Sequence, residues 1–146
     1  MDAAAGISRV VDEALFRYLA DVEVTKSQRL RYPVAVLCMT TDPELSPDTA
    51  HLIAHRIAAS IRATDAVSCL PDSSFAILFV NAETFSLPSI FHRITQNTVG
   101  SERSRSWRAG GACFPLTALT SDLLMEQALE QMARARSEPS ATLCLP

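Results

Sequence analysis

Two groups of side chains have the residue types from which metal or catalytic sites are built, and both are incomplete. His51 and His55 lie four residues apart on a predicted helix, with Asp48 one turn earlier. This spacing can chelate a metal ion, but the pattern lacks the Glu of a metalloprotease helix and an evident third ligand. A solvated helix face is the favoured interpretation. We therefore expect no metal site and no cofactor.

Ser73 and Ser74 are the candidates for a nucleophile, and the sequence offers them little support. No His–Asp partner lies nearby, and no G-x-S-x-G turn surrounds them. The cysteines are far apart in the sequence, sit mostly among apolar residues and form no C-x-x-C pair, at positions 38, 69, 113 and 144. Buried free thiols are therefore expected, and a zinc knuckle is not.

Composition limits the class of protein. The chain has 146 residues, of which 48% are apolar, and we expect one domain over residues 1–146 with a proper core. The formal net charge of −3 provides no basic field for nucleic acid. No apolar run approaches the ~20 residues of a membrane helix, and the segment from Met1 to Gly6 does not resemble a signal peptide. A cytoplasmic protein without membrane insertion is expected.

The first half of the chain alternates helix and strand. Residues 1–9 are predicted to be a tail, 10–31 a long leading helix and 33–39 a strand buried on both faces. The expected buried stripe of the leading helix consists of Val11, Leu15, Tyr18, Leu19 and Val22. Ser46 followed by Pro47 is typical of a helix start, and this helix is expected to end near Thr64.

The second half contains a predicted β-hairpin, two helices and two strands. The hairpin strands are 66–70 and 75–80, joined by a turn at 71–74. The later elements are a helix at 86–96, a polar loop at 97–105, a strand at 107–114, a helix at 121–136 and a closing strand at 141–145. This order indicates an α/β (α+β) fold, a sheet flanked by helices as in ferredoxin-like or polymerase-palm domains.

The motifs in these elements resemble those of the GGDEF family, the fold of bacterial diguanylate cyclases, from about Phe16 to the C-terminus. Arg62-Ala-Thr-Asp65 stands where the family has R-x-x-D, and Pro71-Asp-Ser-Ser-Phe75 stands where it has G-G-D-E-F. The strand motif S-x-G-x-A-x-x-P is matched in Gly110, Ala112 and Pro115. Leu124, Ala128, Ala135 and Arg136 match the last helix. The resemblance implies a palm-like fold with a mostly antiparallel central sheet and a long N-terminal helix.

The same resemblance implies that catalysis is lost. The family condenses two GTP molecules into cyclic di-GMP and needs carboxylates to hold divalent metal. Those carboxylate positions fall on Thr40, Ser73 and Ser74, the family's lysine falls on Leu45, and a turn glycine falls on Pro71. Asp42 and Asp72 survive, but two isolated acids do not rebuild a metal site. We expect no catalytic residue and no enzymatic activity, and the loss of turn glycines also argues against GTP binding without turnover.

A possible ligand site remains. Many GGDEF proteins bind cyclic di-GMP at an inhibitory site built on R-x-x-D and a later arginine, and the resemblance places these on Arg62, Asp65 and Arg93. Arginine binds phosphate or the Hoogsteen edge of guanine through two parallel hydrogen bonds. The competing interpretation is an ordinary surface, with Asp65 capping the helix exit or pairing with Arg62. Arg103, Arg105 and Arg108 are further candidates that the sequence does not place.

Two functional hypotheses follow from the resemblance, both in bacterial signalling. In the first, the chain is an inactive regulatory module and a cyclic di-GMP receptor. In the second, it is a protein-interaction or dimerisation scaffold that binds no nucleotide, a role that its long leading helix would suit. A partner protein or self-association is expected in either case. The fold alone does not decide between these two hypotheses, because one fold can support different functions.

Overall fold

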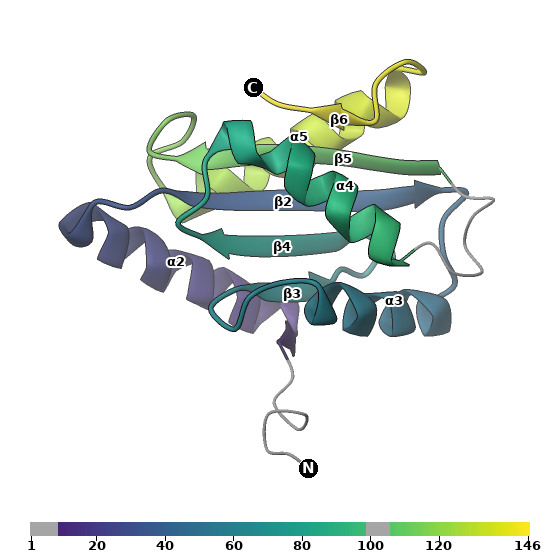
Figure 1. Cartoon of the computed structure of the whole chain (residues 1–146), viewed down its shortest axis with the longest axis horizontal. Coiled ribbons are helices and arrows are strands. Elements are labelled where there is room, and N and C mark those ends of the chain that lie inside the picture. The colour runs from purple at the N-terminus through teal and green to yellow at the C-terminus, as the bar shows by residue number, and fades with distance from the viewer. Residues whose placement is uncertain (1–8, 99–105) are drawn as a thin grey trace, which may run out of the picture.

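The computed structural model describes residues 9–98 and 106–146. In the described ranges the chain forms one six-stranded sheet with the strand order β1-β3-β4-β2-β5-β6 and with helices on both faces (Figure 1). The strands are β1 (Val10–Val11), β2 (Val34–Asp42), β3 (Ala66–Cys69), β4 (Phe75–Val80), β5 (Ser106–Phe114) and β6 (Leu143–Cys144). The helices are α2 (Glu13–Leu30), α3 (Pro47–Ala59), the short 3₁₀ helix η1 (Thr84–Ser86), α4 (Leu87–Thr98) and α5 (Ser121–Ser137).

The four central strands β3, β4, β2 and β5 pair with one another in antiparallel orientation. Strand β2 pairs with β4 on one side and β5 on the other, and β3 completes the hairpin with β4. The edge strands β1 and β6 add in parallel to β3 and β5. The mostly antiparallel sheet and the β3–β4 hairpin with its turn at 71–74 confirm the predicted fold class.

The core is divided by the sheet into two apolar layers. Along β2, Ala35, Leu37 and Met39 face the layer that α3 and α4 cover, whereas Val34, Val36 and Cys38 face the layer that α2 and α5 cover. Successive side chains of β2 point to opposite faces of the sheet, and both faces are covered by helices. Residues 34–39 of the strand are therefore all apolar, which explains the continuous apolar run in the sequence. The buried residues of α5 include Leu124, Ala128, Met132 and Ala135, which recur at helical spacing on the face that packs against the sheet.

Gly110 on β5 is required by the close approach of α5. A Cβ atom at this position would lie 2.0 Å from Met132 N and 2.5 Å from the Ala128 carbonyl oxygen, both backbone atoms of α5. Only glycine leaves room for the helix to pack this closely against the strand. This contact fixes α5 over the centre of the sheet.

The leading helix differs from its prediction in start and in face. It begins at Glu13, not at residue 10, because Asp12 caps it by accepting a hydrogen bond from Leu15 N at 2.8 Å. Val10 and Val11 instead pair with Val67 and Ser68 of β3, a tertiary contact that local periodicity does not show. The buried face is Phe16, Ala20, Val24 and Ser27, whereas Leu15 and Tyr18 of the predicted stripe are 44% and 64% exposed.

Other boundaries also differ from the prediction. The helix predicted to end near Thr64 ends at Ala59, and Ile61 is buried after it. Asn97 and Thr98, predicted to be loop, form the last turn of α4, and the rest of that predicted loop lies outside the described residues. The closing strand is shorter than predicted, at Leu143–Cys144. Arg9, the last residue of the predicted tail, donates from Nη1 to the Ala58 carbonyl at 2.9 Å.

The four cysteines are free, as predicted, and lie on β2, β3, β5 and β6. The predicted burial is confirmed for Cys38 and Cys113, whereas Cys69 and Cys144 are partly exposed. Burial raises the pKa of the Cys38 thiol to about 12. Within residues 9–98 and 106–146, no helix combines the length and the apolar character that crossing a membrane requires.

Candidate functional site

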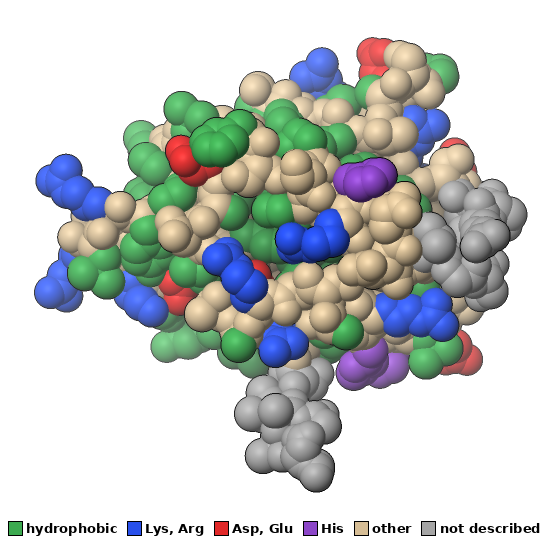
Figure 2. Space-filling view, viewed as in Figure 1, with side chains coloured by type: hydrophobic (Ala, Val, Ile, Leu, Met, Phe, Trp, Pro, Cys, Tyr) green, Lys and Arg blue, Asp and Glu red, His purple; other side chains and the backbone are tan. Residues whose placement is uncertain are grey.

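One pocket of about 470 Å³ brings the three predicted ligand residues together. Arg62 and Asp65 lie on the segment that connects α3 to β3, and Arg93 lies on α4. All three line the pocket, together with residues from the end of α3, from the segment after β4 and from α4, including Ser60, Asn81, Ser86 and Ile90. In Figure 2, basic side chains flank a hollow near the middle of the face shown. The volume is within the ~300–1,000 Å³ typical of small-molecule sites.

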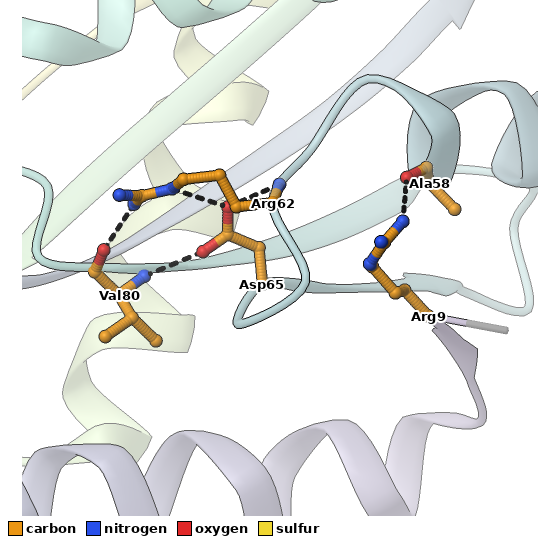
Figure 3. A network of polar contacts seen from close by, with 5 residues as sticks. All are labelled: Arg9, Ala58, Arg62, Asp65 and Val80. Carbon is orange, nitrogen blue, oxygen red and sulfur yellow. Dashed lines mark hydrogen bonds and ion pairs between the residues drawn. The ribbon is translucent and has the colours of Figure 1, made fainter. Parts of the chain in front are cut away.

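Asp65 is the buried anchor of this pocket. Asp65 is 4% exposed, and its two carboxylate oxygens accept three hydrogen bonds (Figure 3). Oδ2 accepts from Arg62 N at 3.0 Å and from Arg62 Nε at 3.3 Å, and Oδ1 accepts from Val80 N at 3.1 Å. The carboxylate therefore closes the segment after α3 and ties it to the end of β4. Its acceptor capacity is largely used inside the protein.

Arg62 is held by Asp65 but keeps part of its guanidinium free. Nε donates to the Asp65 carboxylate and Nη2 donates to the Val80 carbonyl oxygen (Figure 3). The side chain is nevertheless 57% exposed, and Nη1 has no hydrogen-bond partner among the described residues. A guanidinium carries five N–H donors in a fixed plane. Asp65 thus orients a donor group that still has hydrogens to offer a ligand.

Arg93 supplies a second guanidinium to the same pocket. It is exposed on α4, and it forms no hydrogen bond or ion pair with residues 9–98 or 106–146. Phe91 and Ile94, its neighbours on α4, are buried against the sheet, so the helix packs on one face and presents Arg93 on the other. The pocket therefore combines one oriented arginine with one that has no partner in the described part of the chain.

Of the further arginines considered from the sequence, Arg108 does not line this pocket. Arg108 lies on β5, and its Nη1 donates to the Ala141 carbonyl beside β6. Arg103 and Arg105 lie outside the described residues.

The β3–β4 turn is closed by its own hydrogen bonds. Leu70 N donates to the Ser74 carbonyl at 2.8 Å, and Ser73 N donates to the Leu70 carbonyl at 2.9 Å. Asp72 Oδ1 accepts from both the backbone N and the hydroxyl of Ser74. Ser73 has a positive φ of 65°, and Ser74 is fully buried. Asp72, the acid that survives in this turn, is therefore occupied in stabilising it.

The end of β2 lies at the same edge of the sheet as this turn, because Met39 of β2 pairs with Phe75 of β4. Thr40 is 2% exposed, and Leu45 is 4% exposed and belongs to the apolar layer under α3 and α4. A buried leucine cannot serve the phosphate-binding role of an exposed lysine. No three His, Cys, Asp or Glu side chains come together to hold a metal ion in the described part of the chain.

The sequence did not identify two residues that shape the pocket. Asn81 follows β4 with a positive φ of 61°, and its backbone N donates to the Pro33 carbonyl at 2.7 Å. Asn97 of α4 donates from Nδ2 to the Ser60 hydroxyl at 3.2 Å, joining α4 to the end of α3. An asparagine after an apolar strand is a weak turn signal. The Asn97 contact spans 37 residues and has no local signal.

The fold is similar to that of solved GGDEF domains. The GGDEF domain of YfiN (also called TpbB) from Pseudomonas aeruginosa is 23% identical, with 92% of this chain and 95% of that chain covered and a TM-score of 0.73. A microbial GGDEF domain described in a novel interaction mode with cyclic di-GMP is 18% identical, with coverages of 93% and 94% and a TM-score of 0.72. The coiled coil and GGDEF domain of DgcB from Caulobacter crescentus, in complex with c-di-GMP, is 12% identical, with coverages of 97% and 84% and a TM-score of 0.73.

These similarities show that the chain has the GGDEF-domain fold, as its motifs predicted. No protein-family model matches the sequence, and no curated protein matches it significantly. The fold is therefore retained at an identity below 25% to these structures.

Proposed function

We propose that this chain is a GGDEF-like regulatory module that does not synthesise cyclic di-GMP and that binds this dinucleotide through Arg62 and Arg93. The observation that carries the proposal is the meeting of these two side chains at one pocket, where Arg93 has no partner among the described residues. Two of the solved GGDEF structures similar to this chain are described with cyclic di-GMP. Cyclic di-GMP offers phosphates and guanine edges, and both fit planar guanidinium donors.

The residue types at the end of β2 and in the β3–β4 turn support the proposed absence of cyclic di-GMP synthesis. Positions 40, 73 and 74 carry hydroxyl side chains instead of carboxylates, and Leu45 is buried. Triphosphate chemistry with Mg²⁺ requires charged oxygen ligands at fixed places. Asp42 is exposed at the end of β2, and Asp72 is already hydrogen-bonded to Ser74.

In this proposal the three site residues have unequal roles. Arg93 and the free edge of Arg62 contact the ligand, and Asp65 positions Arg62. The buried carboxylate of Asp65 already accepts from Arg62 N, Arg62 Nε and Val80 N, so it holds the guanidinium at the pocket instead of replacing it as a ligand. The family resemblance implies that Asp65 contacts the ligand directly, whereas this proposal gives it a positioning role.

Calorimetric titration with cyclic di-GMP tests the proposal. The wild type should bind, and Arg93→Ala and Arg62→Ala should each weaken binding at least about tenfold, since losing one charge-assisted contact costs ~1.5–3 kcal/mol. Arg56→Ala is the matched control, because Arg56 is an exposed arginine on α3 that does not line the pocket. Absence of heat with the wild type, or equal loss with Arg56→Ala, would reject the proposed site.

The scaffold hypothesis keeps one specific observation in its favour. Leu15 and Tyr18 lie three residues apart on α2 and are 44% and 64% exposed, so they share an uncovered helix face. If this face mediates self-association, light scattering should show a dimer that Leu15→Ser and Tyr18→Ser dissociate. A dimer that is indifferent to cyclic di-GMP, together with no heat in the titration, would favour the scaffold over the receptor.

A further inference from the structure

His51 and His55 lie on the exposed face of α3, away from the Arg62–Arg93 pocket. Their Nε2 atoms are 3.3 Å apart, and their ring centroids are 4.8 Å apart with an interplanar angle of 81°. Both side chains are open to solvent. In Figure 2, histidine atoms lie at the surface where Figure 1 places α3. The rings therefore turn their Nε2 atoms toward each other, although solvent would accommodate other rotamers.

This separation matches the geometry of two ligands on one metal ion. Nitrogen ligands ~2.0–2.1 Å from a tetrahedral zinc ion are about 3.3–3.4 Å apart. The helix supplies the alignment, because residues four apart lie one above the other on the same face. We propose that His51 and His55 form a two-histidine chelate for Zn²⁺ or a similar borderline divalent ion, with water in the remaining coordination positions. The sequence alone led us to expect no metal here.

The metal-free contact is consistent with this site. At 3.3 Å one imidazole donates its Nε2–H and the other accepts, since two N–H groups cannot face each other at that distance. A metal ion takes the place of the shared hydrogen and binds both nitrogens. Binding leaves Nδ1 of each ring as the protonated nitrogen, because Nε2 is occupied by the metal ion.

The chemistry of the two nitrogens determines which ions fit. Imidazole suits Zn²⁺, Ni²⁺ and Cu²⁺, whereas Mg²⁺ and Ca²⁺ prefer oxygen ligands. Binding across one turn also links two residues of α3 in the folded state alone, so it stabilises the fold by mass action. At a free Zn²⁺ concentration 100 times the Kd, the ratio of folded to unfolded protein should rise about 100-fold.

The test uses the full chain without an affinity tag. Calorimetric titration with Zn²⁺ should show saturable binding of one ion per chain, and Zn²⁺ should raise the urea midpoint of unfolding. Mg²⁺ at the same concentration should leave the midpoint unchanged. No Zn²⁺-dependent heat or shift with the wild type would overturn the proposal.

Three variants locate the site. His51→Ala and His55→Ala should each abolish the Zn²⁺ effect, and both positions are exposed, so the variants should fold. His92→Ala is the matched control, because His92 is the third histidine, exposed on α4, and it should bind Zn²⁺ like the wild type. Cys69 and Cys144 are partly exposed thiols that also attract zinc. Binding that persists at full strength in the His51→Ala/His55→Ala double variant would assign the ion to another site and refute the chelate.

Discussion

Removing the Asp65 carboxylate should destabilise the protein far more than its place on a surface segment would indicate. Asp65→Ala removes three hydrogen bonds, from Arg62 N, Arg62 Nε and Val80 N. A hydrogen bond to a charged group contributes ~1.5–3 kcal/mol, but the Nε bond involves a side chain that is 57% exposed, so we count it at no more than about 0.5–1 kcal/mol.

The two backbone bonds account for most of the expected loss. Their donors must find water or remain unpaired once the carboxylate is gone, which gives a total of about 3 kcal/mol after relaxation of the segment. For a chain of this length such a loss lowers the Tm by roughly 6–12 °C. Arg62→Ala should cost only about 1 kcal/mol, since it removes an exposed partner and leaves Asp65 its backbone donors.

Urea unfolding followed by circular dichroism measures both variants against the wild type. Asp65→Asn should lie between the wild type and Asp65→Ala, because its single amide oxygen can accept either from the Arg62 donors or from Val80 N, while its NH₂ group then faces the other donor. A loss below about 1 kcal/mol for Asp65→Ala would refute the anchor role, since it is less than one charged hydrogen bond. Equal losses for Asp65→Ala and Arg62→Ala would refute the argued asymmetry.

Three further predictions concern the core, the thiols and the proposed absence of cyclic di-GMP synthesis. Gly110→Ala should cost about 3 kcal/mol in urea unfolding because its Cβ would clash with α5 backbone atoms. Gly111→Ala should cost about 1 kcal/mol, since its close contacts would be with the flexible Leu87 and Leu145 side chains and the Val36 carbonyl oxygen would lie at an ordinary 3.6 Å. Equal costs for the two variants would contradict this prediction. Burial raises the pKa of the Cys38 thiol to about 12, so the thiol of the unfolded chain loses its proton at a lower pH than the folded one. The free energy of unfolding should therefore fall as pH rises from about 9 toward 12, by up to ~1.4 kcal/mol per pH unit. Cys38→Ala should reduce this dependence of stability on pH, and an unchanged dependence would contradict the prediction. Incubation of the wild type with GTP and Mg²⁺ should yield no cyclic di-GMP by chromatography. Leu45→Lys should not produce synthesis and should lower the free energy of unfolding by about 3 kcal/mol, because it places a charge in the core. Cyclic di-GMP formed by the wild type would contradict the proposed absence of synthesis.

The sequence predicted those elements whose signals are local. Ser46 before Pro47 located the start of α3, and the apolar run after Pro33 indicated a strand buried on both faces, now seen as β2. The start of α2 was missed because Val10 and Val11 were counted by helical period, although Asp12 is the cap. The buried face of α2 also differs from the predicted one, because the small residues Ala20 and Ser27 allow close packing, whereas apolar periodicity favours the larger Leu15 and Tyr18.

In the candidate site, too, the sequence predicts local features but not contacts between distant residues. The R-x-x-D spacing and the later Arg93 were visible in the sequence, and the fold brings them to one pocket. The pairing of Asp65 with Arg62, which the sequence offered as the alternative to a ligand contact, is observed. The hydrogen bond from Val80 N to Asp65 has no local signal, because Val80 lies 15 residues away on β4. Likewise, the i, i+4 spacing of His51 and His55 is local, but the 3.3 Å approach of their Nε2 atoms depends on rotamers that the sequence does not specify.

The central claim is that cyclic di-GMP binds between Arg62 and Arg93. Arginine side-chain Nε–H resonances, assigned by NMR through Arg62→Lys, Arg93→Lys and Arg56→Lys variants, report on this directly. Addition of cyclic di-GMP should shift the Arg62 and Arg93 resonances and leave Arg56 unchanged. Unperturbed Arg62 and Arg93 resonances at saturating dinucleotide would contradict the account.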